Sequence, residues 1–254
     1  MEKETKLVDN NKPGDVEYIV ISGKGSRLLT TFNSPMAFEP TNFGYEIALC
    51  RLETYYSFPN IDKGNNAIRV SIDSGKNWID LSIPTGCYDI EGINEALQLL
   101  LGERGEKKSH IVLKGNRNTL KCVLEIAKDS TIVDFNVKNS IRCVLGFEAK
   151  KYMGGKRYES ENKVNILRVN SILVHCDIIN SSRVNGMLTP TIYNFFPNVS
   201  PAEKIVCQPA HLMYIPLSLY TISSMTAWIT DQEGKLLDLG GERLAITFHI
   251  RKRR

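Results

Sequence analysis

Arg243-Leu-Ala-Ile-Thr-Phe-His-Ile-Arg251, near the end of the chain, is the stretch of sequence that decides the fold. Its apolar residues Leu244, Ile246, Phe248 and Ile250 alternate with Ala, Thr, His and Arg side chains. A period of two directs one set of side chains into a core and the other toward solvent or a neighbouring molecule. We therefore predict a β-strand that ties this end of the chain into a sheet.

Strand-like segments also fill most of the chain before this stretch. From residue 164 onward nearly every segment reads as a strand, and Asp231-Gln-Glu-Gly234 predicts a hairpin turn. In the first half, the alternating segments 68–73 and 78–83 predict a hairpin through Ser74-Gly75. We predict about fourteen strands and two helices in total, with no internal repeat. The predicted class is mainly β.

One stripe of apolar residues has helical spacing, and its members are Ile90, Ile93, Leu97, Leu100 and Leu101. Asp89 is the expected N-cap of this helix, which should end near Gly102. A shorter helix is expected from a cap at Asn139 or Ser140 to Leu145, where Gly146 stops it. The segment 150–162 has the composition of a linker.

Size and composition indicate a folded domain. The chain has 254 residues, of which 42% are hydrophobic and 24% charged, so it can bury a substantial core. We expect no membrane span, because no apolar run approaches the ~18 residues that one requires. Met1-Glu-Lys-Glu-Thr-Lys6 is charged and is not expected to be a signal peptide, so synthesis in the cytosol is predicted.

The two ends of the chain differ in their expected roles. Residues 1–14 lack periodicity and are interpreted as a flexible arm that a partner would order. Arg251, Lys252, Arg253 and Arg254 supply four positive charges, which equals the formal net charge of +4. This predicts a nearly neutral body with a basic tail that contacts nucleic acid or serves in nuclear import. A solvated terminus without a partner is the alternative.

Residues with catalytic or metal-binding chemistry form no constellation that we can assemble. The six cysteines lie more than twenty residues apart, which excludes zinc spacing and favours buried thiols. No acidic residue lies next to His110 or His249 to orient the ring, and only His211 is placed in a loop where it is free to act. His175 and Cys176 are adjacent in a strand and therefore face opposite sides. We predict a protein that is not an enzyme and that has no cofactor or metal.

Two aromatic clusters are the candidate subunit contacts. The first ends a long strand and comprises Tyr55, Tyr56 and Phe58; the second precedes Pro197 and comprises Tyr193, Phe195 and Phe196. Tyr and Phe are enriched in interface cores, and burial in the protein's own core is the alternative explanation.

Recurrent phrases over residues 44–251 carry a family resemblance. They include Thr54-Tyr-Tyr-Ser-Phe-Pro-Asn-Ile61, Ile83-Pro-Thr-Gly-Cys-Tyr-Asp-Ile90, Ile172-Leu-Val-His-Cys-Asp-Ile178, Pro197-Asn-Val-Ser-Pro201 and the ending 239–251. In these phrases the chain resembles the minor capsid (penton) proteins of Polinton/Maverick elements and the related adintoviruses. The arm and residues 150–162 lie outside the resemblance.

The resemblance implies a jelly-roll sandwich whose copies form the pentameric vertices of an icosahedral virion. Because a single jelly roll needs about eight strands, we expect an inserted or appended α+β subdomain with both helices at 85–162. The sandwich would then comprise 15–84 and 163–250, followed by the basic tail 251–254. Two small β-barrels side by side are the structural alternative.

Expected partners are further copies of the chain, the major capsid protein and packaged DNA at the tail. Synthesis in the host cytoplasm could be followed by nuclear import for assembly. The functional alternative is a β-sandwich binding module that recognises a host receptor or glycan through loop aromatics such as Tyr56 or Phe196.

Overall fold

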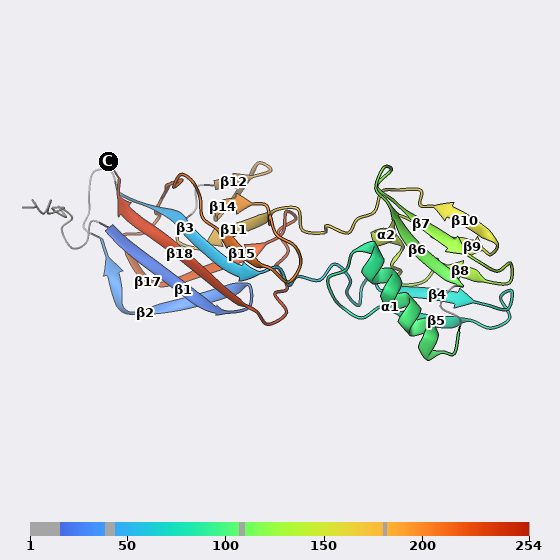
Figure 1. The fold of residues 1–254 in the computed structure, drawn as a ribbon. Helices are drawn as coiled ribbons and strands as arrows, with labels where there is room; N and C mark the ends of the chain where they lie inside the picture. The colour runs from blue at the N-terminus through green and yellow to red at the C-terminus, as the bar shows by residue number, and fades with distance from the viewer. Residues whose placement is uncertain (1–15, 39–43, 107–109, 180–181, 254) are drawn as a thin grey trace, which may run out of the picture. The chain divides into compact units, whose positions relative to one another are not determined.

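The computed structural model describes residues 16–38, 44–106, 110–179 and 182–253. It divides into two compact units (Figure 1). The first comprises Met1–Ser57 and Val169–Arg254 and is called the sandwich below; the second, Phe58–Arg168, is called the insertion. Most regular structure in the described residues is strand, so the prediction of a mainly β protein is confirmed.

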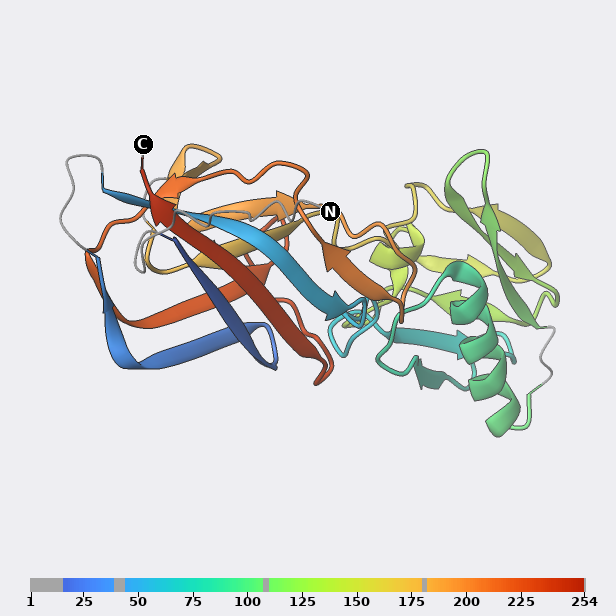
Figure 2. The ribbon, with the colours of Figure 1, turned by 60° about the vertical axis from the view of Figure 1, so that its left-hand side comes forward.

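The sandwich is built from two antiparallel sheets. The first sheet has the order β1-β18-β3-β15, with the short β16 also pairing with β3. Its strands are β1 (Val16–Lys24), β18 (Arg243–Lys252), β3 (Tyr45–Tyr55), β15 (Lys204–Cys207) and β16 (Ile215–Pro216). The predicted C-terminal strand is therefore β18, and it lies between β1 and β3 (Figure 2).

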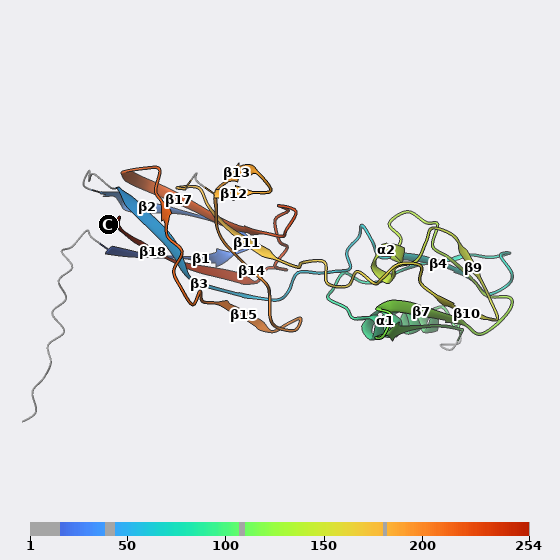
Figure 3. The same ribbon diagram turned by 90° about the horizontal axis from the view of Figure 1, so that it is seen from above.

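The second sheet has the order β14-β11-β17-β2. Its strands are β14 (Thr191–Phe195), β11 (Ile172–Cys176), β17 (Thr221–Thr230) and β2 (Arg27–Ala37). A separate hairpin of β12 (Ser182–Val184) and β13 (Met187–Thr189) precedes β14. Seen from above, β2 and β17 lie in one layer and β1, β18 and β3 in the other (Figure 3).

The connectivity of the eight main strands is that of a jelly roll. In chain order they are β1, β2, β3, β11, β14, β15, β17 and β18. The first and eighth strands pair, as do the third and sixth, in one sheet; the second and seventh, and the fourth and fifth, pair in the other. This order results when one long antiparallel ribbon folds over itself. The predicted jelly-roll sandwich is confirmed.

Alternation along β18 produces the sandwich core. Leu244, Ile246, Phe248 and Ile250 are all buried, as the sequence predicted. On β3 the inward set changes parity, because the pairing with β18 skips Cys50 at a bulge between Thr247 and Phe248. The bulge lets both Ile47 and Leu52 point into the core although they are five residues apart.

The insertion is an α+β unit with two open sheets. One sheet has the order β5-β4-β8-β9 and the other β10-β7-β6. The strands are β4 (Ala67–Ser71), β5 (Ile79–Ser82), β6 (Ile111–Asn116), β7 (Lys121–Ile126), β8 (Ile132–Asp134), β9 (Lys151–Met153) and β10 (Lys156–Glu159). The alternative of two barrels does not apply, since every sheet in the described residues has two edge strands.

Both helices belong to the insertion, as predicted. Helix α1 (Ile90–Glu103) begins after Asp89, whose carboxylate accepts a hydrogen bond from the Gly92 amide at 2.7 Å. Its apolar stripe joins a core with both sheets. Helix α2 (Arg142–Leu145) ends at Gly146, whose φ of 82° suits glycine. Its N-cap residue is Ile141 and not Asn139 or Ser140, although the Ser140 hydroxyl accepts from the Arg142 amide at 3.3 Å.

The insertion is longer than the sequence indicated. We expected residues 58–84 in the sandwich and an insertion of 85–162, whereas the chain divides at Phe58 and Arg168. The predicted hairpin of β4 and β5 exists, but β4 also pairs with β8, about sixty residues later. Alternation identifies a strand and its buried face, yet it does not identify a distant partner strand.

Residues 150–162 are not a linker. They form the hairpin of β9 and β10 around Gly154 and Gly155. Gly155 has a φ of 66°, and a Cβ at Gly154 would overlap the carbonyl oxygen of Lys128. The glycines that suggested a flexible linker are required by a tight turn against a neighbouring loop. In the described residues, the longest apolar helix is still too short to cross a bilayer.

Candidate subunit interface

Of the first aromatic cluster, only Tyr55 reaches the surface. It ends β3 on the outer face of its sheet and is 42% exposed. Tyr56 is buried, and its backbone exchanges hydrogen bonds with Glu203 and Ala202 at 2.9 and 2.8 Å. Phe58 is buried within the insertion, where its carbonyl accepts from the Cys87 thiol at 3.2 Å. Tyr56 is therefore no exposed loop aromatic available to a ligand.

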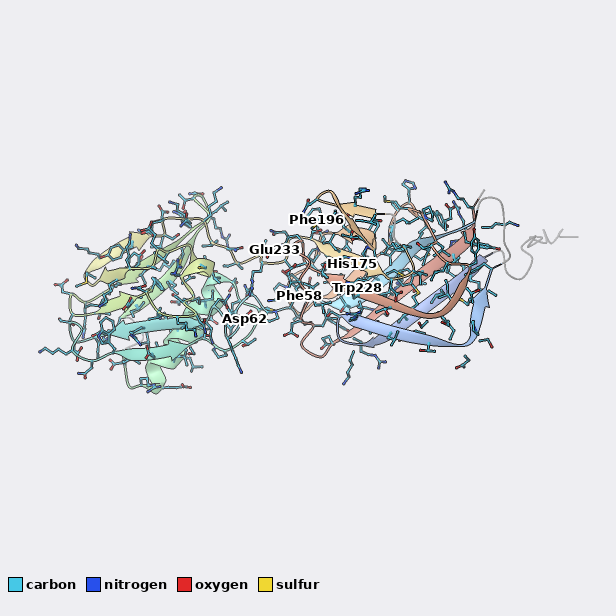
Figure 4. The ribbon with its side chains drawn as sticks, turned by 180° about the vertical axis from the view of Figure 1, so that it is seen from behind. Phe58, Asp62, His175, Phe196, Trp228 and Glu233 are labelled. Carbon is cyan, nitrogen blue, oxygen red and sulfur yellow. The ribbon has the colours of Figure 1, made fainter. Side chains whose placement is uncertain are left out.

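The second cluster lies on and beside β14. Tyr193 and Phe195 are half-buried and pair across the sheet with Val174 and Ile172 of β11. Phe196 follows the strand and is 71% exposed (Figure 4). The two predicted clusters belong to different sheets, β3 in one and β14 in the other. Only Tyr55 and Phe196 expose much of their side chains.

The outer face of the β1-β18-β3-β15 sheet carries exposed residues that our sequence reasoning missed. Tyr18 and Val20 on the edge strand β1 are 68% and 65% exposed, and Val206 on the other edge strand, β15, is 48% exposed. The signal was present in residues 16–22, where apolar side chains occupy both faces and not one. The sequence of such a segment does not show which of its two apolar faces the sheet leaves exposed.

The same outer face of the β1-β18-β3-β15 sheet carries an aromatic cluster around His249. The His249 ring contacts Tyr18, with ring centroids 4.6 Å apart, and its Nδ1 lies 2.7 Å from the Tyr214 hydroxyl. The Arg251 guanidinium lies 3.5 Å from the centre of the Tyr214 ring. Burial and the nearby Arg251 charge lower the pKa of His249, and burial raises the pKa of Tyr214. The neutral imidazole is therefore the form that this cluster favours.

The basic tail is shorter than predicted. Arg251 lies within β18 and its Nε donates to Glu46 Oε1 at 2.8 Å, so it is part of the sheet surface. Lys252 ends the strand, and Arg253 donates its amide to the Gly44 carbonyl at 2.9 Å; both side chains are exposed. Arg254 lies outside the described residues.

Charge is distributed unevenly between the two units. The insertion holds 18 Lys and Arg residues against 14 Asp and Glu, while the rest of the chain holds 14 of each. The net charge of +4 is therefore located in the insertion, and the basic tail is balanced by acidic residues elsewhere in the sandwich. The body without the tail is neutral in sum, as predicted, but this sum combines a basic insertion with an acidic sandwich.

Another buried histidine, His175, lies on the outer face of the other sheet. His175 Nε2 lies 2.9 Å from the Thr230 hydroxyl and Nδ1 lies 3.1 Å from that of Thr191. Its ring stacks on Trp228 (Figure 4), which in turn contacts the Arg27 guanidinium. Burial lowers the pKa of His175 to about 4, and both nitrogens are engaged. This ring is built for packing and not for proton transfer.

The remaining reactive groups are dispersed. All six cysteines are free, and burial raises the pKa of both Cys122 and Cys176 to about 12, so these thiols stay protonated. Within the described part of the chain, no three His, Cys, Asp or Glu residues are grouped as a metal site would require.

Comparisons with known proteins identify the fold. No family model and no curated protein sequence matches the chain. Among solved structures, the crystal structure of the mavirus penton protein is similar, with a TM-score of 0.50 at 9% sequence identity. The likeness covers 93% of this chain and 99% of that one. The jelly roll with its insertion is thus a penton-like fold.

Proposed function

We propose that the chain is a structural capsid protein, a penton-type minor capsid subunit that forms the pentameric vertices of an icosahedral virion. The observation that carries the proposal is the extent of the structural likeness, which takes in nearly all of both chains. It therefore includes the sandwich together with an insertion of more than a hundred residues. The resemblance of sequence phrases to Polinton/Maverick and adintovirus penton proteins supports the same assignment.

A closed ring of five requires two different surfaces that meet head to tail, which is a heterologous interface. The sandwich offers candidates at opposite edges of one sheet: Tyr18 and Val20 on β1, and Val206 with Tyr55 beside β15. Large aliphatic and aromatic side chains exposed on strand edges are typical of surfaces that a partner covers. Phe196 extends the candidate surface on the β14 side.

The major capsid protein is the proposed partner of the vertex as a whole. Packaged DNA is the proposed partner of Lys252, Arg253 and Arg254. Arg251 is left out of this set because it pairs with Glu46 on the sheet surface. Replacing these three residues with Gln should lower DNA retention and reduce the dependence of binding on salt by about one unit of slope per lost phosphate contact. On this proposal the protein is made in the host cytoplasm and is imported into the nucleus, where it assembles into virions that package DNA.

The test of the ring is the mass of the purified full-length protein, measured by light scattering over a range of concentrations. A pentamer is the expected result. Val20→Asp and Val206→Asp should each prevent it, because each buries a charge in the proposed contact. Leu99→Asp, at a 61% exposed position on α1 in the insertion, is the matched control and should leave the pentamer intact.

A different mass would change the assignment. A trimer would contradict the vertex proposal, and a protein that stays monomeric at all concentrations would favour the binding module with Phe196 as its exposed aromatic. Circular dichroism of each variant separates loss of assembly from loss of folding.

A further inference from the structure

Asn185-Gly186, at the tip of the β12–β13 hairpin, is the only Asn-Gly sequence in the chain. The side-chain amide of an asparagine is open to attack by the backbone nitrogen of the next residue. Glycine hinders this attack least, because it has no Cβ and its backbone adopts conformations that other residues avoid. The surroundings of Asn185 in the fold therefore decide whether the attack takes place.

The two residues form the loop of a tight turn that is open to solvent. They lie between the paired residues Val184 and Met187, and their φ angles are 50° and 81°, as a two-residue type I′ turn requires. Both are exposed, and a Cβ at Gly186 would meet nothing within 4 Å. The Arg183 Nη1 donates to the Gly186 carbonyl at 3.2 Å and not to the reacting groups. Water therefore reaches the Asn185 amide and the Gly186 nitrogen.

The hairpin is weakly held. It has three residue pairs, and among the described residues β12 and β13 pair only with each other. A two-stranded hairpin by itself is marginally stable, so it opens locally while the sandwich stays folded. Opening lets Asn185 bring its side-chain Cγ to the Gly186 nitrogen. Asn194 is also exposed, but it is paired with Leu173 in the second sheet and is followed by the bulky Phe195.

We propose that Asn185 is a site of spontaneous deamidation in the folded protein. The Gly186 nitrogen, having lost its proton to hydroxide, attacks the Asn185 Cγ and forms a succinimide ring. The bond from Cγ to the side-chain nitrogen breaks, and that nitrogen takes up protons from water and leaves as ammonia. A water molecule then opens the ring. Hydrolysis at Cγ yields aspartate, and hydrolysis at the backbone carbonyl carbon yields isoaspartate, so each event consumes one water and releases one ammonia.

The two products change the hairpin differently. Aspartate before glycine suits the same type I′ turn, so it preserves the pairing of Val184 with Met187. Isoaspartate adds a methylene to the backbone of the loop and disturbs that pairing. All three residues of β12, together with Thr191–Asn194 of β14, line a cavity of about 360 Å³, so isoaspartate also alters one wall of this cavity. The inference does not depend on the proposed function, although in a virion no synthesis would replace the converted copies.

The test follows the purified full-length protein by mass spectrometry during incubation at pH 8.5 and, in parallel, at pH 6. Cleavage after Arg183 and Lys204 releases one peptide that contains Asn185, Asn194 and Asn198, so the last two are internal references. We expect conversion of amide to acid at Asn185 alone, with separate aspartate and isoaspartate forms. It should be faster at pH 8.5, because more of the Gly186 amide is deprotonated. An intact Asn185, or equal conversion at all three asparagines, would overturn the proposal.

Three variants identify the reaction and the state of the protein in which it occurs. Asn185→Gln should lose the conversion, because its longer side chain would have to close a larger ring. Asn194→Gln, in the neighbouring β14, is the matched control and should leave the rate at Asn185 unchanged. Phe248→Ala removes a buried side chain from the sandwich core and should also leave this rate unchanged, because local opening of the hairpin is sufficient. A rate that rises with the unfolded fraction of this variant would show that the reaction needs the unfolded chain, which contradicts the proposal.

Discussion

The sandwich and the insertion differ in how their strands find partners. In the sandwich, β1 pairs with β18 and β3 with β15, so strands from opposite ends of the chain form each sheet. In the insertion, β4 pairs with β5, β6 with β7 and α1 packs against β6, all close in sequence. The difference teaches that an inserted unit with mostly local contacts can sit within one loop of a jelly roll without altering the order of its strands.

If the sandwich and the insertion have separate cores, a substitution in one core should not destabilise the other unit. The largest expected loss of stability follows truncation of a side chain in the sandwich core. Phe248→Ala should cost about 3–5 kcal/mol of sandwich stability, since Phe248 is fully buried and a cavity remains. Hydrogen exchange should show faster opening of peptides from β3, β17 and β18, with peptides from α1 and β7 unchanged. Equal loss of protection in both units would show that they unfold as one cooperative body.

The reciprocal variant is Leu97→Ala in α1, which should cost about 2–5 kcal/mol and affect only the insertion.

The stability of the sandwich should fall at acidic pH because of His175. Its pKa falls from the ordinary 6.5 to about 4 because burial disfavours the charged ring. The unfolded chain therefore binds the proton first as pH falls, so this contribution is complete above about pH 6.5, declines below it and is lost by about pH 4. The shift corresponds to about 3 kcal/mol, and the lowered pKa of His249 acts in the same direction.

His175→Gln should flatten this dependence, because the amide can still meet the two threonine hydroxyls but does not titrate. The measurement is denaturant unfolding of the sandwich between pH 7.5 and pH 4. An unchanged slope in the variant would show that other groups cause the acid sensitivity.

The tight turn of the insertion should tolerate no side chain. Gly154→Ala would drive a Cβ into the backbone carbonyl of Lys128 and should cost about 1–3 kcal/mol, confined to the insertion. Met153→Ala at the adjacent exposed position is the control and should be nearly neutral. Thermal unfolding followed in both variants compares them directly, and equal midpoints would contradict the close approach.

The smallest expected effect concerns the cap of α1. Asp89→Ala removes the acceptor for the Gly92 amide and should destabilise the insertion by about 1 kcal/mol. Asp89→Asn keeps an oxygen acceptor and should recover most of that loss. A sandwich transition that moves with Asp89→Ala would argue against independent units.

The sequence alone determined the elements whose signals are local. The alternation of 243–251, the stripe of α1 with its cap at Asp89, and the turn at Asp231–Gly234 all appear in the structure. Residues 164–167 and 235–239 also have strand-like composition but form no strand; Leu237 and Leu239 are buried, whereas Leu167 is 64% exposed. A short apolar segment does not by itself specify a partner strand. Burial of Tyr56 and Phe58 likewise had no local signal that would separate core from surface.

Only the tertiary structure decided what depends on partners distant in sequence. It placed β4 with β8 and so moved the boundary of the insertion from 85 to 58. It paired Arg251 with Glu46, brought Tyr18 and Tyr214 around His249, and opened the cavity between β12 and β14. The physical reason is that period and propensity report the environment of a residue along its own strand. The identity of the neighbouring strand is set by the summed burial of the whole fold.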